Sequence, residues 1–356
     1  MPKSSVPTVV DLFSGCGGLS YGLIQAGFNV ILGVDNDKDS LITFEANHPG
    51  SKAVNIDLAD PNSAKMIRAT VKNRQIDVIV GGPPCQGFSL TGPRNMEDTR
   101  NKLYLSMFNI VKEIKPKSFL IENVSGMATL YGGKVKEDII TKFEGIGYNV
   151  KAKLLCAADY GVPQMRKRLV FVGLLKEIGE FNFPEPICQK DNYQTCSEAI
   201  SDLPSREESL GEEEDDYRGK PTTKYQKAMQ NGSKKLFNHV ASAHTEKIVK
   251  VISQVPEGGN HRSLPTGVGK HRNFHEAWTR YHSQKPSRTI DTGHRNHFHY
   301  KYNRIPTVRE NARLQSFPDT FKFYGSRTSQ NRQVGNAVPP LLSFNIGKEL
   351  ISIISK

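Results

Sequence analysis

A single cysteine stands at the end of an apolar stretch of this chain, in the sequence Gly-Gly-Pro-Pro-Cys85-Gln-Gly-Phe-Ser. Residues 76–80 predict a buried strand, and the glycines and prolines that follow end it in a fixed turn. Open α/β sheets carry their chemistry at this position, beyond the carboxyl end of a strand. A thiolate there can add to an electrophilic carbon. A lone cysteine is often only a small buried hydrophobe, but the position of Cys85 favours a catalytic nucleophile.

An acidic residue closes another apolar stretch, residues 119–121, in the sequence Phe-Leu-Ile-Glu122-Asn-Val. Burial would raise the pKa of the Glu122 carboxyl and let it donate a proton. A salt-bridged structural glutamate is the alternative interpretation. Because Glu122 follows the next strand after Cys85, we favour a functional role.

A glycine-rich turn, Asp11-Leu-Phe-Ser-Gly-Cys-Gly-Gly18, follows the first expected strand and opens a helix. Glycines let the backbone approach a ligand and leave helix N–H groups free. The turn lacks the G-x-G-x-x-G spacing and the lysine of a phosphate loop. Asp35 ends the second strand, where an acid can bond ribose hydroxyls, and Asp57 ends a third. Together these acids and the turn predict an adenosine-type pocket without a pyrophosphate clamp.

The first 175 residues alternate apolar strands with amphipathic helices. This pattern predicts an α/β fold, a parallel sheet with helices on both faces. Residues 103–114 have helical spacing with a core-facing apolar side, and residues 341–354 predict a closing amphipathic helix. The expected strands are residues 6–12, 30–34, 76–80, 119–121 and 169–174.

Composition narrows the class of protein. The chain has 356 residues, 37% hydrophobic and 24% charged, which is typical of a globular protein with room for two domains. It has neither an apolar run of membrane-spanning length nor a signal-peptide core, so we expect a cytosolic protein without a membrane partner. Five cysteines without a CxxC pair argue against a zinc site. His297 and His299 would share a strand face, yet no cysteine is near, and we expect no metal.

Positive charge is concentrated in one part of the chain. The net charge is +12, and residues 217–300 hold 15 Lys and Arg against 4 Asp and Glu. Such a segment indicates a polyanionic partner, nucleic acid first, with a solvated loop-rich surface as the alternative. The acidic residues 212–216 predict an exposed loop or linker.

In the order of its motifs the chain resembles the cytosine-5 DNA methyltransferases, in particular those of bacterial restriction-modification systems. The matching blocks are residues 11–20, Asp35, Asp57, and residues 81–89, 122–124, 160–168, 309–318 and 333–339. The resemblance implies a Rossmann-like S-adenosylmethionine-dependent methyltransferase domain with a smaller, irregular target-recognition domain. On this basis residues 1–186 begin the catalytic domain, residues 187–300 recognise the target, and residues 301–356 return to complete the catalytic domain.

The resemblance also assigns catalytic roles. The activity implied is that of a DNA (cytosine-5-)-methyltransferase, EC 2.1.1.37. Cys85 would add to carbon 6 of cytosine, and Glu122 would protonate or hydrogen-bond ring nitrogen 3. Arg168 would contact the pyrimidine carbonyl, with Arg166 as a supporting or phosphate-facing residue. The cytosine must leave the duplex to react, and residues 86–100 would form a loop that closes over it.

Cofactor and DNA contacts follow from the same resemblance. S-adenosylmethionine would lie over the glycine-rich turn, leaving as S-adenosylhomocysteine. Phe13 and Asn36 would lie against its adenine, Asp35 on its ribose and Asp57 on its exocyclic amine. The full expected cofactor set is Asp11, Phe13, Ser14, Gly15, Gly17, Gly18, Asp35, Asn36, Asp57, Leu58, Pro84, Leu103, Asn336 and Val338. The expected DNA contacts are Gln86, Ser89, Arg100, Arg262, Arg272, Arg280, Arg288 and Arg295.

We therefore expect a monomer that acts on double-stranded DNA in a prokaryotic cytosol, paired in function with a restriction endonuclease. Three alternatives remain. A tRNA cytosine methyltransferase on the same framework would typically carry Cys-Phe-Thr, which this chain lacks. The missing pyrophosphate loop argues against a nucleotide-binding dehydrogenase. Intact Cys85, Glu122 and Arg168 argue against a DNA-binding protein without activity.

Overall fold

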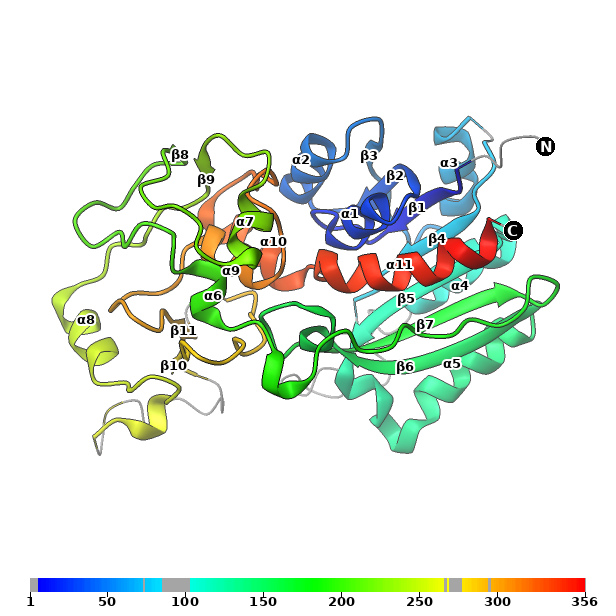
Figure 1. Cartoon of the computed structure of the whole chain (residues 1–356). Helices are drawn as coiled ribbons and strands as arrows, with labels where there is room; N and C mark the ends of the chain where they lie inside the picture. The colour runs from blue at the N-terminus through cyan, green and yellow to red at the C-terminus, as the bar shows by residue number, and fades with distance from the viewer. Residues whose placement is uncertain are drawn as a thin grey trace. The chain divides into compact units, whose positions relative to one another are not determined.

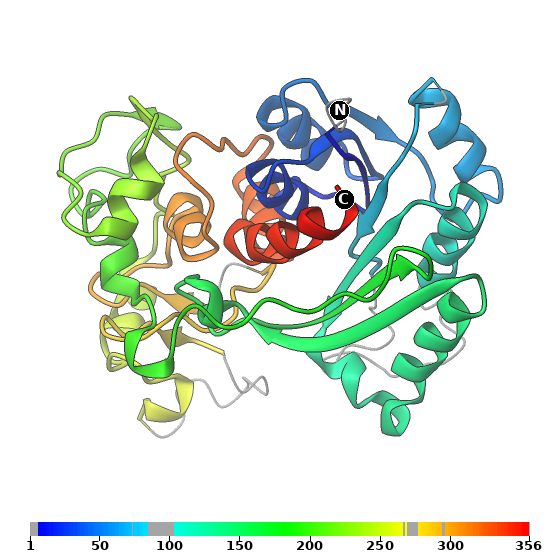
Figure 2. The same cartoon turned by 45° about the vertical axis from the view of Figure 1, so that its right-hand side comes forward.

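The computed structural model describes residues 6–72, 74–84, 103–265, 268, 277–293 and 296–355. The chain forms two compact units. Unit 1 comprises Met1–Cys156, Lys167–Pro186 and Val338–Lys356, and unit 2 comprises Ala157–Arg166 and Ile187–Ala337. Figures 1 and 2 show the sheet of unit 1 and the short, irregular elements of unit 2. The chain therefore leaves unit 1 twice before its last helix returns there.

A seven-stranded sheet of order β3-β2-β1-β4-β5-β7-β6 forms the centre of unit 1. The first five strands of that order are parallel, whereas β7 runs antiparallel to both of its neighbours. The sheet is therefore mixed, not wholly parallel as predicted, because β6 and β7 are consecutive strands that lie side by side without a helical crossover. The strands are β1 (Thr8–Leu12), β2 (Asn29–Asp35), β3 (Lys52–Asn55), β4 (Val78–Gly81), β5 (Ser118–Val124), β6 (Tyr148–Cys156) and β7 (Lys167–Leu175).

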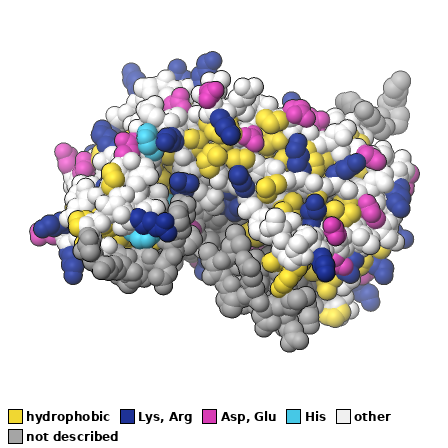
Figure 3. Space-filling view, turned by 90° about the horizontal axis from the view of Figure 1, so that it is seen from below, with side chains coloured by type: hydrophobic (Ala, Val, Ile, Leu, Met, Phe, Trp, Pro, Cys, Tyr) yellow, Lys and Arg dark blue, Asp and Glu magenta, His cyan; other side chains and the backbone are white. Residues whose placement is uncertain are grey.

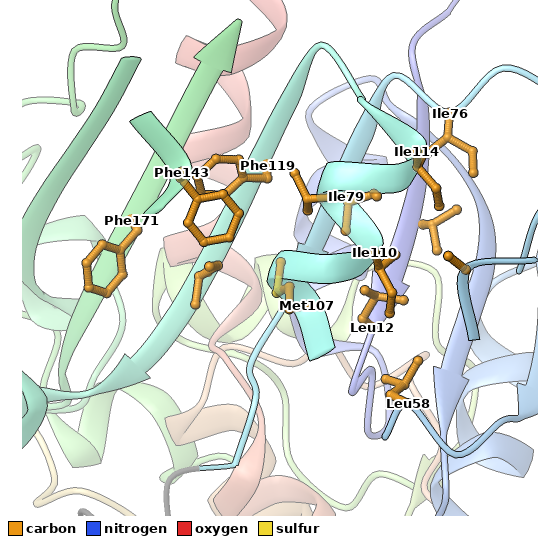
Figure 4. Close-up of a cluster of buried hydrophobic side chains, with 14 of the residues drawn as sticks. Leu12, Leu58, Ile76, Ile79, Met107, Ile110, Ile114, Phe119, Phe143 and Phe171 are labelled. Carbon is orange, nitrogen blue, oxygen red and sulfur yellow. The ribbon is translucent and has the colours of Figure 1, made fainter. Parts of the chain in front are cut away.

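Three helices, α3 (Ser63–Thr70), α4 (Leu103–Ile114) and α5 (Lys134–Glu144), cover one face of this sheet. Figure 4 shows the apolar core beneath them, in which Met107 and Ile110 of α4 pack with side chains of the strands. The α4 bounds are those that the apolar spacing predicts. The pattern succeeds here because a helix with one apolar stripe gains most of its stability from burying that stripe.

The helices α1 (Gly18–Gln25), α2 (Lys38–Asn47) and α11 (Pro340–Ile354) lie on the other face, with α11 beside α1 (Figures 1 and 2). The stretch Arg327–Ile354 is long and apolar enough to cross a membrane by length and composition only. It is interrupted after Asn336, where α10 (Arg327–Asn336) ends, and 56% of its apolar window is buried. It therefore has the character of a core segment.

Unit 2 is built from short elements: η5 (Ala157–Tyr160), η6 (Lys190–Asn192), α6 (Cys196–Ile200), β8 (Glu214–Asp215), α7 (Lys224–Gln230), β9 (Leu236–Phe237), α8 (Glu246–Ser253), η7 (His261–Ser263), β10 (Thr279–Arg280), β11 (His297–Phe298), α9 (Val308–Leu314) and α10. Buried ion pairs hold much of it together. Arg313 pairs with Asp319 at 2.7 Å and with Asp202 at 2.6 Å, and Arg304 pairs with Glu310 at 2.6 Å. These pairs explain why apolar periodicity is weak in this part of the sequence.

The two units do not have the expected bounds. Residues 301–337 pack within unit 2, and only Val338 onward joins the sheet of unit 1. The reason is that α9 carries Arg309 and Arg313, whose side chains bond to carbonyl and carboxylate oxygens of unit 2. Residues 301–356, which follow the expected target-recognition segment, are thus divided between the two units. Which unit performs which function stays a prediction.

Candidate active site

The turn after β1 is tied to the end of β2 through Asp35. The Gly15 N–H donates to Asp35 Oδ2 at 2.8 Å, and the N–H groups of Asn36 and Asp37 donate to Oδ1 at 2.8 and 2.9 Å. Three backbone donors thus fix the carboxylate, which remains half-buried. Ionised carboxylate oxygens can accept further hydrogen bonds, so Asp35 can still bind hydroxyl groups of a ligand.

The same turn packs against a buried histidine. Gly17 has a φ of 91°, and a Cβ atom added there would lie 2.2 Å from Cε1 of His48. The His48 ring stacks on Phe44 at 4.0 Å, and its Nε2 lies 3.1 Å from the Gly17 carbonyl oxygen. Burial lowers the pKa of His48 to about 4, so the ring is neutral near pH 7. The sequence analysis missed this support because nothing in the pattern around His48 distinguishes it.

Two polar atoms in the turn are buried without a hydrogen-bond partner, Asp11 Oδ2 and Ser14 Oγ. Burial raises the pKa of the Asp11 carboxyl to about 7, opposed by hydrogen bonding to Ser20 and assisted by the charge of Asp35. Unsatisfied buried polar atoms are costly and rare in native proteins. A polar cofactor that supplies partners to these atoms therefore fits the turn.

The other expected cofactor residues differ in exposure. Phe13 packs against the core while staying half-buried, and Leu58 is fully part of that core, so only its backbone is available to a ligand. Asn36 and Asp57 are exposed beyond the paired strands β2 and β3, and Pro84 and Leu103 are half-buried. Gly18 is the first residue of α1, Asn336 is exposed in unit 2, and Val338 is buried in unit 1.

A second cluster lies at the ends of β5 and β7. Arg168 Nε is 2.7 Å from Glu122 Oε1, and both side chains are largely buried. Burial lowers the pKa of Arg168, while the charge of Glu122 opposes that shift. The side-chain amide of Asn123 donates to the Pro83 carbonyl oxygen at 3.1 Å. The residues that lead directly to Cys85 in the sequence are therefore attached beside Glu122, a contact to which the sequence analysis assigned no role.

Several predicted site residues lie outside the part of the chain that the structure describes: Cys85, Gln86, Ser89, Arg100, Arg272 and Arg295. Of the arginines that were expected to contact DNA and that the structure describes, Arg262 and Arg288 are exposed, as a DNA contact requires.

Two expected roles do not agree with the structure. Arg280 is 5% exposed, and its guanidinium donates to the carbonyl oxygens of Ile252, Val255, His299 and Tyr302. Arg166 is 1% exposed and donates to main-chain carbonyls of unit 2. Because both guanidinium groups are buried, neither can face a phosphate. This contradicts the DNA contact expected of Arg280 and the phosphate-facing alternative for Arg166, whereas the supporting role of Arg166 stays a prediction.

Surface charge does not by itself locate a DNA interface. In Figure 3, Lys and Arg side chains are spread over the visible face, with Asp and Glu among them.

His299 is buried, its Nδ1 accepts from the N–H groups of Lys301 and Tyr302, and burial lowers its pKa to about 3. Within the described residues no group of three or more His, Cys, Asp or Glu could hold a metal ion.

Comparison with known proteins gives consistent matches. Residues 7–352 match the family model of the C-5 cytosine-specific DNA methylases. The chain is 38% identical over 349 residues to the Type II methyltransferase M1.HphI of Haemophilus parahaemolyticus, covering 97% of this chain and 87% of that protein. It is 38% identical over 362 residues to the Type II methyltransferase M.DdeI of Desulfomicrobium norvegicum, covering 94% and 86%.

Solved structures have the same fold. A protein encoded within an E. coli prophage, named as a DNA modification methyltransferase, superposes with a TM-score of 0.80 at 26% identity and covers 98% of this chain and 100% of its own. The S. pombe Dnmt2 methyltransferase superposes with a TM-score of 0.59 at 17% identity, covering 98% and 99%, a likeness of fold alone.

Proposed function

Because the chain belongs to the C-5 cytosine-specific DNA methylase family, and is therefore a DNA cytosine-5 methyltransferase, we propose that it works through a covalent adduct of Cys85 with a flipped-out cytosine. The observation that carries this proposal is the Glu122–Arg168 pair beside the Pro83 carbonyl. The pair lies next to the chain segment that leads to Cys85, which supports assigning Glu122 as the proton donor and Arg168 as the cation of the reaction. The methyl donor that we assign is S-adenosylmethionine.

The chemistry at the base needs a nucleophile and a proton donor. Carbon 5 of cytosine is a poor nucleophile until a thiolate adds at carbon 6. The Cys85 sulfur forms a bond to carbon 6, and the ring nitrogen 3 takes a proton or hydrogen bond from Glu122, so charge does not accumulate on the ring. Arg168 contacts Glu122 through its Nε and donates from Nη1 to the Lys167 carbonyl oxygen at 2.8 Å, so Nη2 is the group that we assign to the pyrimidine carbonyl. Once carbon 5 carries the transferred methyl group, loss of the carbon 5 proton and of any proton taken up at ring nitrogen 3, with cleavage of the bond between carbon 6 and the Cys85 sulfur, would restore the ring.

The turn after β1 is suited to the cofactor. When bound, S-adenosylmethionine supplies an electrophilic methyl group. Asp35 binds the ribose hydroxyls, and the unpartnered Asp11 Oδ2 and Ser14 Oγ accept or donate hydrogen bonds to the polar groups of the amino-acid part. Phe13 and Asn36 bound the adenine, and Asp57 accepts from its amine.

The biological setting follows from the relatives. Two relatives at 38% identity are named Type II methyltransferases, and these names support a role in a bacterial restriction-modification system, in which the protein works as a cytosolic monomer on duplex DNA with a partner endonuclease. Recognition of the target sequence belongs to residues 187–300, with Arg262 and Arg288 as described DNA contacts.

The proposal is tested by incubating the purified protein with methyl-labelled S-adenosylmethionine and either mixed-sequence duplex DNA or tRNA. We expect label at carbon 5 of cytosine in one DNA sequence and none in tRNA. Sequencing the modified DNA identifies the recognition site. Labelled tRNA with unlabelled DNA would contradict the proposal.

A further inference from the structure

A fully buried histidine packs against the glycine-rich turn of unit 1, although the proposed reaction does not use it. His48 follows the last residue of α2. Its ring stacks on Phe44 at 4.0 Å and fills the space where a side chain at Gly17 would begin. Buried ring nitrogens need hydrogen-bond partners, so the contacts of the two nitrogens show what the ring is tied to.

These contacts decide which ring nitrogen of His48 carries the proton. Nδ1 lies 2.7 Å from the Phe44 carbonyl oxygen, and because a carbonyl oxygen only accepts, we assign the proton to Nδ1. Burial lowers the pKa of His48 to about 4, so the ring has a single proton near pH 7. Nε2 is then an acceptor. Of the Gly17 carbonyl oxygen at 3.1 Å and the Ser20 hydroxyl at 3.2 Å, only the hydroxyl can donate to it.

Ser20 connects this histidine to strand β1. The residue is fully buried in α1, and both its N–H and its hydroxyl form hydrogen bonds with the Asp11 carboxyl. A hydroxyl has one proton and two lone pairs, so a Ser20 hydroxyl that donates to His48 can accept from Asp11. Burial raises the pKa of Asp11 to about 7, so the protonated form that donates is populated near neutral pH. One hydroxyl therefore couples the orientations of all three side chains.

The Asp11 end of this chain of hydrogen bonds indicates a ligand. Asp11 is 1% exposed, and its Oδ2 is buried without a hydrogen-bond partner, as is Ser14 Oγ in the same turn. The turn is also the one whose Gly15 N–H donates to Asp35. The chain of hydrogen bonds thus runs from α2 through α1 to an oxygen that a polar ligand can bind, and all of it belongs to unit 1.

We propose that His48 and Ser20 are positioning residues, which orient the Asp11 carboxyl so that its Oδ2 binds the polar amino-acid part of the cofactor. This role rests on the proposed function, which places S-adenosylmethionine over the glycine-rich turn. Because both residues are fully buried, they act through Asp11 and not by touching the cofactor.

The test measures binding of S-adenosylhomocysteine by calorimetry, which needs no turnover. His48→Phe keeps a ring against Phe44 and removes both nitrogens, and Ser20→Ala removes the shared hydroxyl. We expect the dissociation constant to rise about tenfold in each variant, because a buried polar group loses its partner. The double variant should lose no more affinity than either single variant, since residues in one hydrogen-bond network are not additive.

Two further variants separate positioning from packing. Ser118→Ala is the matched control, because Ser118 is also a fully buried serine of unit 1, but its hydroxyl donates to the Gly173 carbonyl oxygen of β7. It should keep the dissociation constant of the wild type while losing stability in urea denaturation. His48→Gln offers Ser20 an amide oxygen as acceptor and should bind S-adenosylhomocysteine more tightly than His48→Phe.

The outcomes distinguish this proposal from the proposed function. If the wild type does not bind S-adenosylhomocysteine, or if Asp11→Ala binds it as tightly as the wild type, the cofactor assignment of the turn falls and this proposal falls with it. If Asp11→Ala weakens binding but Ser20→Ala does not, the positioning role alone is overturned. The same holds if Ser118→Ala weakens binding equally, or if His48→Gln is no better than His48→Phe. If His48→Phe does not fold, Ser20→Ala and His48→Gln are each compared with the wild type.

Discussion

The glycine-rich turn of unit 1 and the arginine pairs of unit 2 bury polar groups in different ways. In the turn, Asp11 Oδ2 and Ser14 Oγ have no hydrogen-bond partner. In unit 2, Arg313 binds Asp319 and Asp202, and Arg304 binds Glu310 through two nitrogens. Buried charges that are paired maintain a structure, whereas buried polar atoms without partners indicate a place for a ligand. Unit 2 also holds buried oxygens without a hydrogen-bond partner, such as Asp202 Oδ2 and Gln330 Oε1. Such an atom therefore indicates a ligand site only together with the sequence motif around it.

Arginines illustrate the difference. Arg168, Arg262 and Arg280 were all expected to contact the base or the DNA. In the structure, however, Arg168 contacts the Glu122 carboxylate, Arg262 is exposed and Arg280 is buried. Residue type and net charge describe a segment as a whole. They do not say which guanidinium bonds to its own main chain.

The first prediction tests the catalytic side of the comparison, where the largest effect is expected. Glu122→Gln keeps the shape of the side chain and removes the proton donor. Single-turnover methylation should fall by about 10²–10⁴, the usual contribution of general acid catalysis. Binding of S-adenosylhomocysteine is the control and should not change. A rate close to that of the wild type would mean that Glu122 only anchors Arg168.

The second prediction removes the buried ion pairs that Arg313 forms in unit 2. Arg313→Met removes the cation that pairs with the buried Asp202 and Asp319, and leaves Asp319 with the Tyr217 hydroxyl at 2.6 Å and Arg309 at 3.8 Å. This should lower the free energy of unfolding by about 3–5 kcal/mol in urea denaturation. Lys235→Met removes a pair with Asp216 that lies at the surface at 2.7 Å and should cost far less. Equal losses in the two variants would show that burial does not decide the contribution of these pairs.

The third prediction concerns Asp35. Its carboxylate accepts hydrogen bonds from backbone N–H groups, as a structural residue does, yet the side chain stays half-buried and can still bind a ligand. Asp35→Ala should raise the dissociation constant of S-adenosylhomocysteine about tenfold or more, since a charge-assisted hydrogen bond contributes about 1.5–3 kcal/mol. Asp37→Ala is the control, because Asp37 caps α2 through the Ser40 N–H and should affect stability only. Unchanged binding in Asp35→Ala would remove Asp35 from the cofactor site.

The fourth and smallest effect is a pH dependence. Burial raises the pKa of Asp11 from 3.8 to about 7, so between these values the folded state binds a proton that the unfolded state has lost. Stability conferred by this group therefore decreases as pH rises through that window. Asp11→Asn, which resembles the protonated form, should unfold at higher urea than the wild type at pH 8, with a smaller advantage at pH 5. An advantage that does not vary with pH would contradict a buried titrating Asp11.

Sequence patterns predicted the unit 1 sheet well where strands are wholly buried, as β1, β2, β4, β5 and β7 show. They missed β6, because Lys151 and Lys153 interrupt its apolar residues at the edge of the sheet. They also missed the antiparallel direction of β7. The direction of a strand depends on the connection that precedes it, and the residue pattern of the strand itself does not indicate it. The role of His48 was beyond prediction, because two of its partners, the Gly17 carbonyl oxygen and the Ser20 hydroxyl, are far away in the sequence.

The account depends most on Cys85 as the nucleophile that the Glu122–Arg168 pair serves. Duplex DNA that carries 5-fluorocytosine at the recognition site cannot lose its carbon 5 substituent and should trap the adduct when S-adenosylmethionine is present. We expect a band that survives denaturation with the wild type and with Cys188→Ala, which changes a half-buried cysteine of unit 2. Cys85→Ala should give no such band. A band of equal intensity from Cys85→Ala would contradict the covalent mechanism.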